Sequence, residues 1–327
     1  MAEAFNRVAE LYVGTFQDGN STSKGYQIDG LDFDFDVKRS SAFYRDSASF
    51  TIYNFNDETA QQIMDGGCSV IFRAGYKNQQ VGNIFIGQIA RAWPEFMPDG
   101  TRTMNVVCNA QRGAQYPLTR TYISLSFPVG SSLYSIIKNI ADFVGVPLSG
   151  ASGLKSVTLS KDDGPYVDTG SVRDVVCNFV RRKLRALGWF VILSNNEMIC
   201  IDKTDKTTLE TVYLNFKSGL LSAKPLRDDS FQSSEEAFNE NRAYYLGETG
   251  EKKKTTKAIP KSGKACVSFE SILNPALSVG LPIYIDARRN SADHLSVLGK
   301  FWIKELEFKG SNYGNEFSAS GKAEERA

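Results

Sequence analysis

The chain has a single histidine, His294, within the polar stretch RRNSADH. Histidine is the usual general base beside a catalytic serine or cysteine. No Ser/His/Asp order, nucleophile elbow or Cys-His arrangement can be assembled around His294. We therefore expect a surface histidine in a loop, and the sequence gives no positive support for an enzyme.

Two neighbouring carboxylates could serve a glycosidase, in which one carboxyl group has a raised pKa and the other is ionised. Glu235 and Glu236 are adjacent, but they lie in a polar segment without an apolar wall that would desolvate either group. We interpret them as part of a solvated surface. The chain also lacks both common glycine-rich phosphate-binding motifs. We predict no catalytic residue.

The cysteines have neither the spacing of a zinc site nor that of a disulfide framework. They are five in number, widely scattered and without a C-x-x-C pair: Cys68, Cys108, Cys177, Cys200 and Cys266. A structural zinc site would need ligands from distant elements, and an odd number does not fit a set of disulfides. We expect reduced, buried thiols in a protein made in a cytoplasm, with no metal and no cofactor.

Basic and acidic residues nearly balance, with 38 Lys plus Arg against 37 Asp plus Glu and a formal net charge of +1. A protein whose main task is to neutralise phosphates carries a clear basic excess, so any DNA contact should be local or incidental. The apolar runs are far shorter than the roughly 20 residues of a membrane-spanning helix. The N-terminal segment MAEAFNRVAELYVGTF does not read as a signal peptide. We expect a soluble protein without membrane insertion.

One candidate for partner contact is a helix with a basic outer face. The face includes Arg181, Arg182 and Arg185, with Arg173 and Lys183 beside them. Charge runs on amphipathic helices usually form a solvated face. The alternative is contact with an acidic partner surface or with passing nucleic acid, and the sequence leaves both open.

A second candidate is the long loop 227–263, which is polar, charged and mostly aperiodic. A loop of this length inside a compact domain is either a functional arm or disordered. Aromatic side chains are typical interface anchors, and lysines can meet an acidic partner. The candidate contacts in this arm are Phe231, Phe238, Tyr244, Tyr245, Lys252, Lys253 and Lys254.

The first third of the chain predicts strands with one buried face. At 327 residues the length suggests roughly two domains, and 42% hydrophobic residues suffice for real cores. Period-two alternation predicts strands in GLDFDFDVKRS and SASFTIYNF, followed by CSVIFRAGY, GNIFIGQIARAWPEF and TRTMNVVCNA. The side chains expected to point inward are Leu31, Phe33, Phe35, Val37, Phe50, Ile52 and, in an open alternative, Asn54.

A short helix should interrupt these strands. Asn56 can cap it, and acidic residues suit the positive end of its dipole. Its apolar stripe would consist of Ala60, Ile63 and Met64. Several strands around one small helix, without βαβ alternation, predict an antiparallel barrel domain over residues 1–118.

The middle of the chain, residues 119–205, changes to helical periodicity. A helix near 131–144 starts at Ser131 or Ser132 and ends at Gly145. Another helix near 171–187 has a capping-box-like start and ends at Gly188. Its apolar face comprises Val172, Val175, Val176, Phe179, Val180, Leu184 and Leu187. WFVILSNNEMICID then predicts a hairpin, so this region should be a small α+β domain.

The last third, residues 206–327, returns to period two. TVYLNF, KACVSFESIL, GLPIYIDA and GKFWIKELEFKG are predicted strands, the last with a bulge. The long loop 227–263 separates them, and SGKAEERA is expected to be a polar tail. We predict a second barrel domain, and therefore a mainly β chain whose two antiparallel β-barrel domains flank an α+β part.

Five segments in this order resemble the baseplate hub proteins of contractile bacteriophage tails, the late-control-type hubs that join tail tube to spike. The segments are SASFTIYNFNDETAQQI (47–63), SVIFRAGYKNQQVGNIFIGQI (69–89), FKSGLLSAKPL (216–226), VSFESILNPALSVGLPIYID (267–286) and GKFWIKELEFKGSNYGNEFSAS (299–320). Each alone is mainly hydrophobic pattern with Gly, Asn and Pro at turns. Their order and spacing carry the resemblance, which spans most of the chain.

The resemblance implies two barrels of the tail-tube type flanking smaller α+β domains, assembled as a homotrimer. Six similar units around a channel would then match a six-fold tube on one side and a three-fold spike on the other. The implied partners are the spike, the tail tube or a tube-initiator protein, and neighbouring baseplate proteins. DNA would be passing cargo only, and the location would be the virion tail baseplate, assembled in the host bacterial cytoplasm.

One feature departs from this family, which usually joins the GLL and ILNP segments by a short turn, whereas residues 227–263 intervene here. Two other functions are alternatives. A hub-associated peptidoglycan hydrolase would need a catalytic constellation, which the sequence does not offer. A receptor- or carbohydrate-binding tail protein would show fibre-like repeats, and the sequence has no internal repeat of fixed period. The sequence therefore favours a non-catalytic structural hub.

Overall fold

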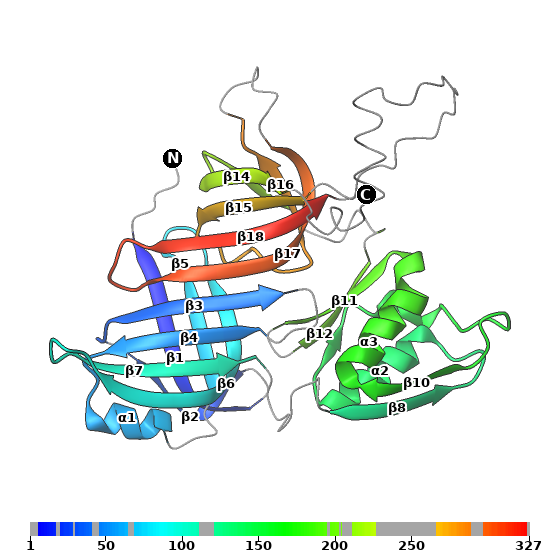
Figure 1. The fold of residues 1–327 in the computed structure, drawn as a ribbon, viewed down its shortest axis with the longest axis horizontal. Helices are drawn as coiled ribbons and strands as arrows, with labels where there is room; N and C mark the ends of the chain where they lie inside the picture. The colour runs from blue at the N-terminus through cyan, green and yellow to red at the C-terminus, as the bar shows by residue number, and fades with distance from the viewer. Residues whose placement is uncertain are drawn as a thin grey trace, which may run out of the picture.

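The computed structural model describes residues 6–17, 20–28, 30–40, 46–64, 69–110, 121–194, 197–202, 204, 211–226, 266–288 and 297–325. One sheet of 13 strands runs through the first and last thirds of the chain (Figure 1). A smaller α+β part comes between them in sequence and lies beside the sheet. The predicted fold class is confirmed as mainly antiparallel β structure with an α+β part, whereas the division of the strands into two barrel domains stays a prediction.

The first third supplies seven strands and one helix. They are β1 (Arg7–Gln17), β2 (Asn20–Ile28), β3 (Phe33–Ser40), β4 (Ser47–Tyr53), α1 (Asp57–Met64), β5 (Ser69–Tyr76), β6 (Val81–Phe96) and β7 (Arg102–Asn109). The spatial order of the strands is β3-β4-β7-β6-β5-β1-β2. The strands predicted from Phe33 onward are confirmed, whereas β1 and most of β2 were not predicted.

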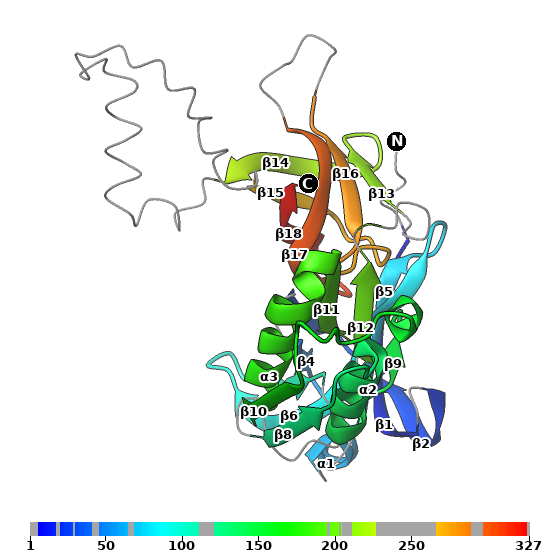
Figure 2. The same ribbon diagram turned by 90° about the vertical axis from the view of Figure 1, so that its right-hand side faces the viewer.

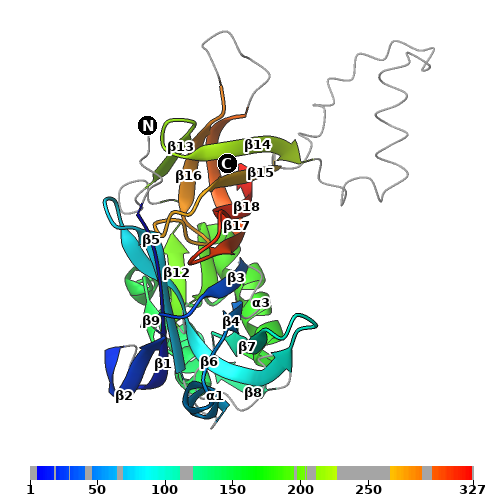
Figure 3. The same ribbon diagram turned by 90° about the vertical axis from the view of Figure 1, so that its left-hand side faces the viewer.

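The last third supplies six more strands. They are β13 (Val212–Asn215), β14 (Leu220–Leu226), β15 (Cys266–Ile272), β16 (Pro282–Asp286), β17 (Leu298–Ser311) and β18 (Phe317–Glu325). The order β14-β15-β18-β17 continues directly into β3, so β14 and β2 lie at opposite ends of the sheet (Figure 3). The expectation of a polar tail at SGKAEERA is wrong, because this segment continues β18 as far as Glu325 and buries Ala323.

Strand β17 joins the two parts of the sheet. Its residues 298–302 pair with β16, whereas 305–311 pair with β3. The register with β18 shifts between Ile303 and Glu305, which confirms the predicted bulge. Beyond the strand, the Asn312 side chain accepts a hydrogen bond from the Phe33 amide (2.8 Å) and donates one to the Leu31 carbonyl (2.8 Å). Segments from the two ends of the chain are thus held in one sheet.

The inward faces of β3 and β4 follow the predicted alternation, because Phe33, Phe35, Val37, Phe50 and Ile52 are all buried. They share one core with side chains from the last third. For example, the rings of Phe35 and Phe317 pack edge to face at 5.7 Å.

Two other side chains differ from the prediction. Asn54 is exposed, because β4 ends at Tyr53 and the backbone turns into the left-handed region (φ 53°), so that Phe55 fills the core instead. In α1 the Asn56 side chain accepts the predicted capping bond from the Thr59 amide (2.7 Å). Met64 is 51% exposed, however, because it ends the helix on the side away from the core.

The middle part has its own core under α2 and α3, which lie side by side (Figure 2). Its elements are β8 (Tyr122–Phe127), α2 (Leu133–Val144), β9 (Leu148–Ser149), β10 (Tyr166–Ser171), α3 (Val172–Phe179), β11 (Trp189–Ser194) and β12 (Glu197–Asp202). Ser132 caps α2 through the Ser135 amide, and Gly145 ends it at φ 77°. Both termini of the first predicted helix and the β11–β12 hairpin are confirmed.

The second predicted helix is not α-helical throughout. Ser171 caps α3 as expected, but the α-helix ends at Phe179 and continues as a π turn over Val180–Leu184 and a 3-10 turn over Arg185–Leu187. The apolar spacing explains the change, because Leu184 lies five positions after Phe179, and a π turn keeps both in the core. Leu187 is 41% exposed, so its predicted place on the buried face is wrong.

A small apolar cluster connects the middle part to the sheet. Ile192 and Ile201 of the β11–β12 hairpin pack against Trp302 of β17. Gly280 lies against the same isoleucines with φ 81°, and a Cβ there would come within 2.5 Å of the Ile201 Cδ1 atom. Only glycine allows this close approach. The predicted boundaries at 118/119 and 205/206 fall outside the described residues and stay predictions.

The thiols are partly as expected. Cys108 and Cys200 are buried, and burial raises the pKa of both, that of Cys200 to about 12. Cys177 is exposed on α3 and Cys266 is intermediate, so the expectation of buried thiols is wrong for these two. Within the described residues, no helix has both the length and the apolar character needed to cross a bilayer.

Candidate assembly surfaces

The solvent side of strands β18, β17, β3, β4 and β7 forms a continuous polar surface, which we call the polar sheet face. The register places Glu307 opposite Lys38 on one side and Ser320 on the other, so side chains of three strands meet on this face. Its members are Ser318, Ser320, Lys322, Glu305, Glu307, Lys309, Asp34, Asp36, Lys38, Ser47, Ser49, Thr51 and Asn105.

Each lysine of this face lies near a carboxylate. Lys38 Nζ lies 3.0 Å from Asp36 Oδ2 and 3.3 Å from Glu307 Oε1, and these two neighbours raise the pKa of Lys38. Lys322 Nζ lies 2.8 Å from Glu305 Oε2, and Lys309 Nζ 3.5 Å from a carboxylate in the turn before β18. Such exposed pairs stabilise the fold little. Their main consequence is a sheet face whose positive charges are locally neutralised.

Two shallow hollows lie along these strands. One of about 560 Å³ spans β15, β18, β17 and β3, with Lys38, Glu305 and Lys322 in its lining. The other, of about 200 Å³, includes Asp34, Ser49 and Lys309. Neither lining contains histidine or cysteine. In the described ranges, no group of three or more His, Cys, Asp or Glu side chains could hold a metal ion.

The predicted basic residues lie together at the end of α3. Arg181, Arg182 and Arg185 are all exposed, and we call them the basic strip. Arg181 Nη2 donates a hydrogen bond to Asn178 Oδ1 (3.0 Å). Arg181 and Arg182 lie in the π turn and Arg185 in the 3-10 turn that follows it, while Leu184 stays buried. Their proximity agrees with the sequence, but their role as partner contacts stays a prediction.

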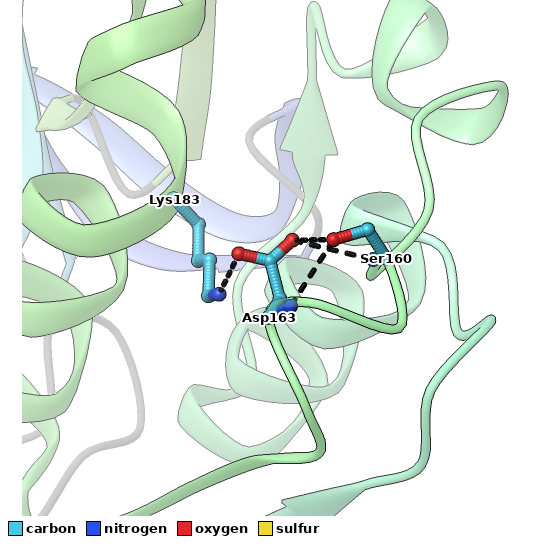
Figure 4. A network of polar contacts seen from close by, with 3 residues as sticks. All are labelled: Ser160, Asp163 and Lys183. Carbon is cyan, nitrogen blue, oxygen red and sulfur yellow. Dashed lines mark hydrogen bonds and ion pairs between the residues drawn. The ribbon is translucent and has the colours of Figure 1, made fainter.

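A polar network fixes the turn that carries the basic strip (Figure 4). Lys183 Nζ donates to Asp163 Oδ1 (2.8 Å), and the Ser160 hydroxyl donates to Asp163 Oδ2 (2.7 Å). Lys183 first, and then Ser160, lower the pKa of Asp163 from 3.8 to about 2. Because Lys183 is paired in this network, it is not available to a partner, and the turn is tied to the loop before β10.

This network predicts a weak acid sensitivity. Because the folded pKa of Asp163 lies below its unfolded value, its stabilising effect is full above about pH 4 and is lost as pH falls toward 2. We expect the melting temperature of Asp163→Asn to approach that of the wild type over this interval. Melting curves at several pH values measure this, and a constant difference between the two proteins down to pH 2 would contradict the assignment.

A further exposed cluster was not predicted from the sequence. The tip of the β6–β7 hairpin presents Phe96, which is 69% exposed, beside Met97. The Arg102 guanidinium stacks on Phe96 (5.6 Å to the ring centroid) and donates to Asp57 Oδ1 (2.7 Å). Exposed Glu58 and Asp99 lie on α1 and in the hairpin turn. We call Asp57, Glu58, Phe96, Met97, Asp99 and Arg102 the hairpin corner.

Solved structures of similar fold cover nearly the whole chain. A tail protein from Neisseria meningitidis has 10% sequence identity and a TM-score of 0.60, over 98% of this chain and 97% of that one. A 43 kDa tail protein of the Shewanella oneidensis prophage MuSo2 has 9% identity and a TM-score of 0.58, over 97% and 98%. This is the fold of phage tail proteins.

The same tail-protein fold occurs in an E. coli component of the type VI secretion system, which is described as structurally similar to the T4 bacteriophage tail proteins gp27 and gp5. It has 13% identity and a TM-score of 0.51, over 90% of this chain and 73% of that one. No family model matches the sequence, and no curated protein does. The likeness is therefore one of fold, at low sequence identity.

Several predicted candidates of this tail-fold chain lie outside the described residues. The arm 227–263 is among them, with Phe231, Phe238, Tyr244, Tyr245, Lys252, Lys253 and Lys254, and so are Glu235, Glu236, His294 and Cys68. The hairpin corner could have been noticed in WPEFMPDG, where Phe96 and Met97 precede an Asp-Gly turn. Polar residues are usual at such a tip, so an apolar pair there is a signal.

Proposed function

We propose that this chain is the non-catalytic structural hub of a contractile phage tail baseplate or a tail-derived particle. It would join a six-fold tail tube to a three-fold spike as a homotrimer. The observation that carries this proposal is the match to tail proteins over nearly the full length of both chains, including both parts of the sheet. The resemblance of the five sequence segments to late-control-type hubs supports it independently.

In this proposal the polar sheet face lines the channel of the trimer. Its lysines lie near carboxylates, so passing DNA would meet a surface without available cations for its phosphates. The spike, the tail tube or a tube-initiator protein, and neighbouring baseplate proteins are the proposed partners. The proposed location is the virion tail baseplate, after assembly in the bacterial cytoplasm.

The mass of the purified chain in solution tests this function. Multi-angle light scattering should give a trimer, either alone or after addition of the spike protein. A chain that stays monomeric with its spike present would contradict the hub. A lysis zone on a peptidoglycan zymogram would contradict the non-catalytic part of the proposal.

The arm 227–263 is proposed as a partner-contact element, and its removal should leave the fold intact. Its polar composition supplies little core, and loop length affects stability only logarithmically. We expect a chain with a short Gly-Ser turn in its place to keep a melting temperature close to that of the wild type, but to assemble poorly with the spike. Normal yields of functional particles from the shortened chain would show that the arm is only a tolerated insertion.

A further inference from the structure

We infer that the basic strip of one chain contacts the hairpin corner of a second copy of this chain. This inference rests on the trimeric hub proposed above and names its subunit contact. A closed ring requires a head-to-tail interface between two different surfaces of the same chain. The basic strip and the hairpin corner are two such surfaces, and they are complementary in charge and in apolar character.

The hairpin corner holds an exposed aromatic side chain, Phe96, in an ordered position that suits a protein interface. The Arg102 guanidinium lies 4.8 Å from the Phe55 ring centroid and 5.6 Å from that of Phe96, and Asp57 holds it from the side. The exposed Phe96 ring is therefore held in place before any partner arrives. Glu58 and Asp99 give the corner an acidic rim. An ordered aromatic inside a charged rim is the usual composition of an interface hot spot.

The basic strip offers the complement to this corner. Lys183 forms an ion pair with Asp163, whereas Arg182 and Arg185 form no hydrogen bond or ion pair with another described residue. Leu187, 41% exposed, follows directly and supplies an apolar contact for an aromatic ring. The π turn and the Asp163 network fix the backbone, so the three arginines are displayed from a rigid support.

Within one chain the elements that carry these two surfaces lie apart. Figure 1 shows α1 and the turn between β6 and β7 at one end of the long axis, and α3 on the other side of the molecule. The basic strip and the hairpin corner therefore cannot contact each other within one chain. In a ring of copies, the corner of each chain would meet the strip of the next.

Reversing the charges on each of the two surfaces of the full-length chain tests the contact. We expect R181E/R182E/R185E, measured by sedimentation equilibrium, to associate about a hundredfold more weakly than the wild type, because like charges would then face each other. E58K/D99K should have the same effect, and Asp57 is left in place because it holds Arg102. A chain that carries all five changes should recover the trimer.

Two substitutions that leave the net charge unchanged separate loss of the contact from loss of the fold. Phe96→Ala should weaken the trimer, whereas Tyr122→Ala removes a similarly exposed aromatic (72%) outside both surfaces and should leave it unchanged. Melting curves of all variants check the fold. Wild-type association should also weaken as salt rises.

These experiments distinguish a failure of the proposed subunit contact from a failure of the trimeric hub. A wild-type chain that is monomeric with and without the spike contradicts the trimer. If R181E/R182E/R185E and Phe96→Ala both still form trimers, only this contact is contradicted. The same holds if the chain with all five charge changes does not recover the trimer. The contact would be established if R181E/R182E/R185E and E58K/D99K each lost the trimer and the chain with all five changes recovered it.

Discussion

Ile52→Asp is expected to abolish the native fold or to lower its melting temperature drastically. Ile52 is fully buried and lies opposite Phe33 in the β3–β4 register. Phe33 in turn packs edge to face on Phe72 at 6.2 Å. An unpaired carboxylate in this core costs several kcal/mol, against a total stability of about 5–15 kcal/mol for a typical domain. Phe33→Asp should have the same effect.

Soluble expression and thermal melting by circular dichroism measure this result. Ser47→Asp is the matched control, because it places a carboxylate on the outward face of the same strand, opposite Lys38. The control should melt like the wild type. An unchanged melting temperature for Ile52→Asp would mean that the two faces of β4 are reversed.

The second large effect concerns the polar sheet face. E305K/E307K should make this face bind DNA more tightly than the wild type does. Lys322 would lose its carboxylate partner Glu305, and Lys38 would lose Glu307 and keep only Asp36. Two further cations would join these lysines. Binding should then rise by about tenfold or more at low salt and fall steeply with salt, since each neutralised phosphate contributes a slope of about −0.9.

Fluorescence anisotropy with a short DNA duplex over a range of salt concentrations measures this change. The matched control is D162K/E197K, which alters the net charge equally but lies in the middle part of the chain. If the control binds DNA as well as E305K/E307K does, net charge alone is responsible and the polar sheet face has no special role.

Local signals in the sequence predicted much of this fold. The alternation at Phe33, Phe35 and Val37 determines which face of β3 is buried, because neighbouring side chains on a strand point to opposite sides. Ser132 and Gly145 set the two ends of α2 through capping bonds with residues a few positions away. These features depend on short stretches of chain, and so they are readable without a structure.

Other features depend on distant contacts that no local pattern reveals. The polar end of β18 forms a strand because Ala319 and Ala323 fit under β15 and β17, although GKAEE alone looks like a tail. The stacking of Arg102 that supports Phe96 also needs the three-dimensional fold. The sequence predicted the basic strip, whereas for the hairpin corner it shows only the apolar pair Phe96 and Met97 and not the contacts of Arg102 that complete it.

The pairing of β3 with β17 has a consequence for the order of synthesis. The amide of Phe33 finds its acceptor on Asn312, 279 positions later in the chain. While a ribosome makes this protein, β3 therefore leaves the exit tunnel long before the strand that covers its edge exists. An uncovered strand edge is a template for aggregation, and native contacts between distant segments form slowly. Nascent chains should therefore depend on chaperones until β17 has emerged, and messages truncated before that point should yield insoluble fragments.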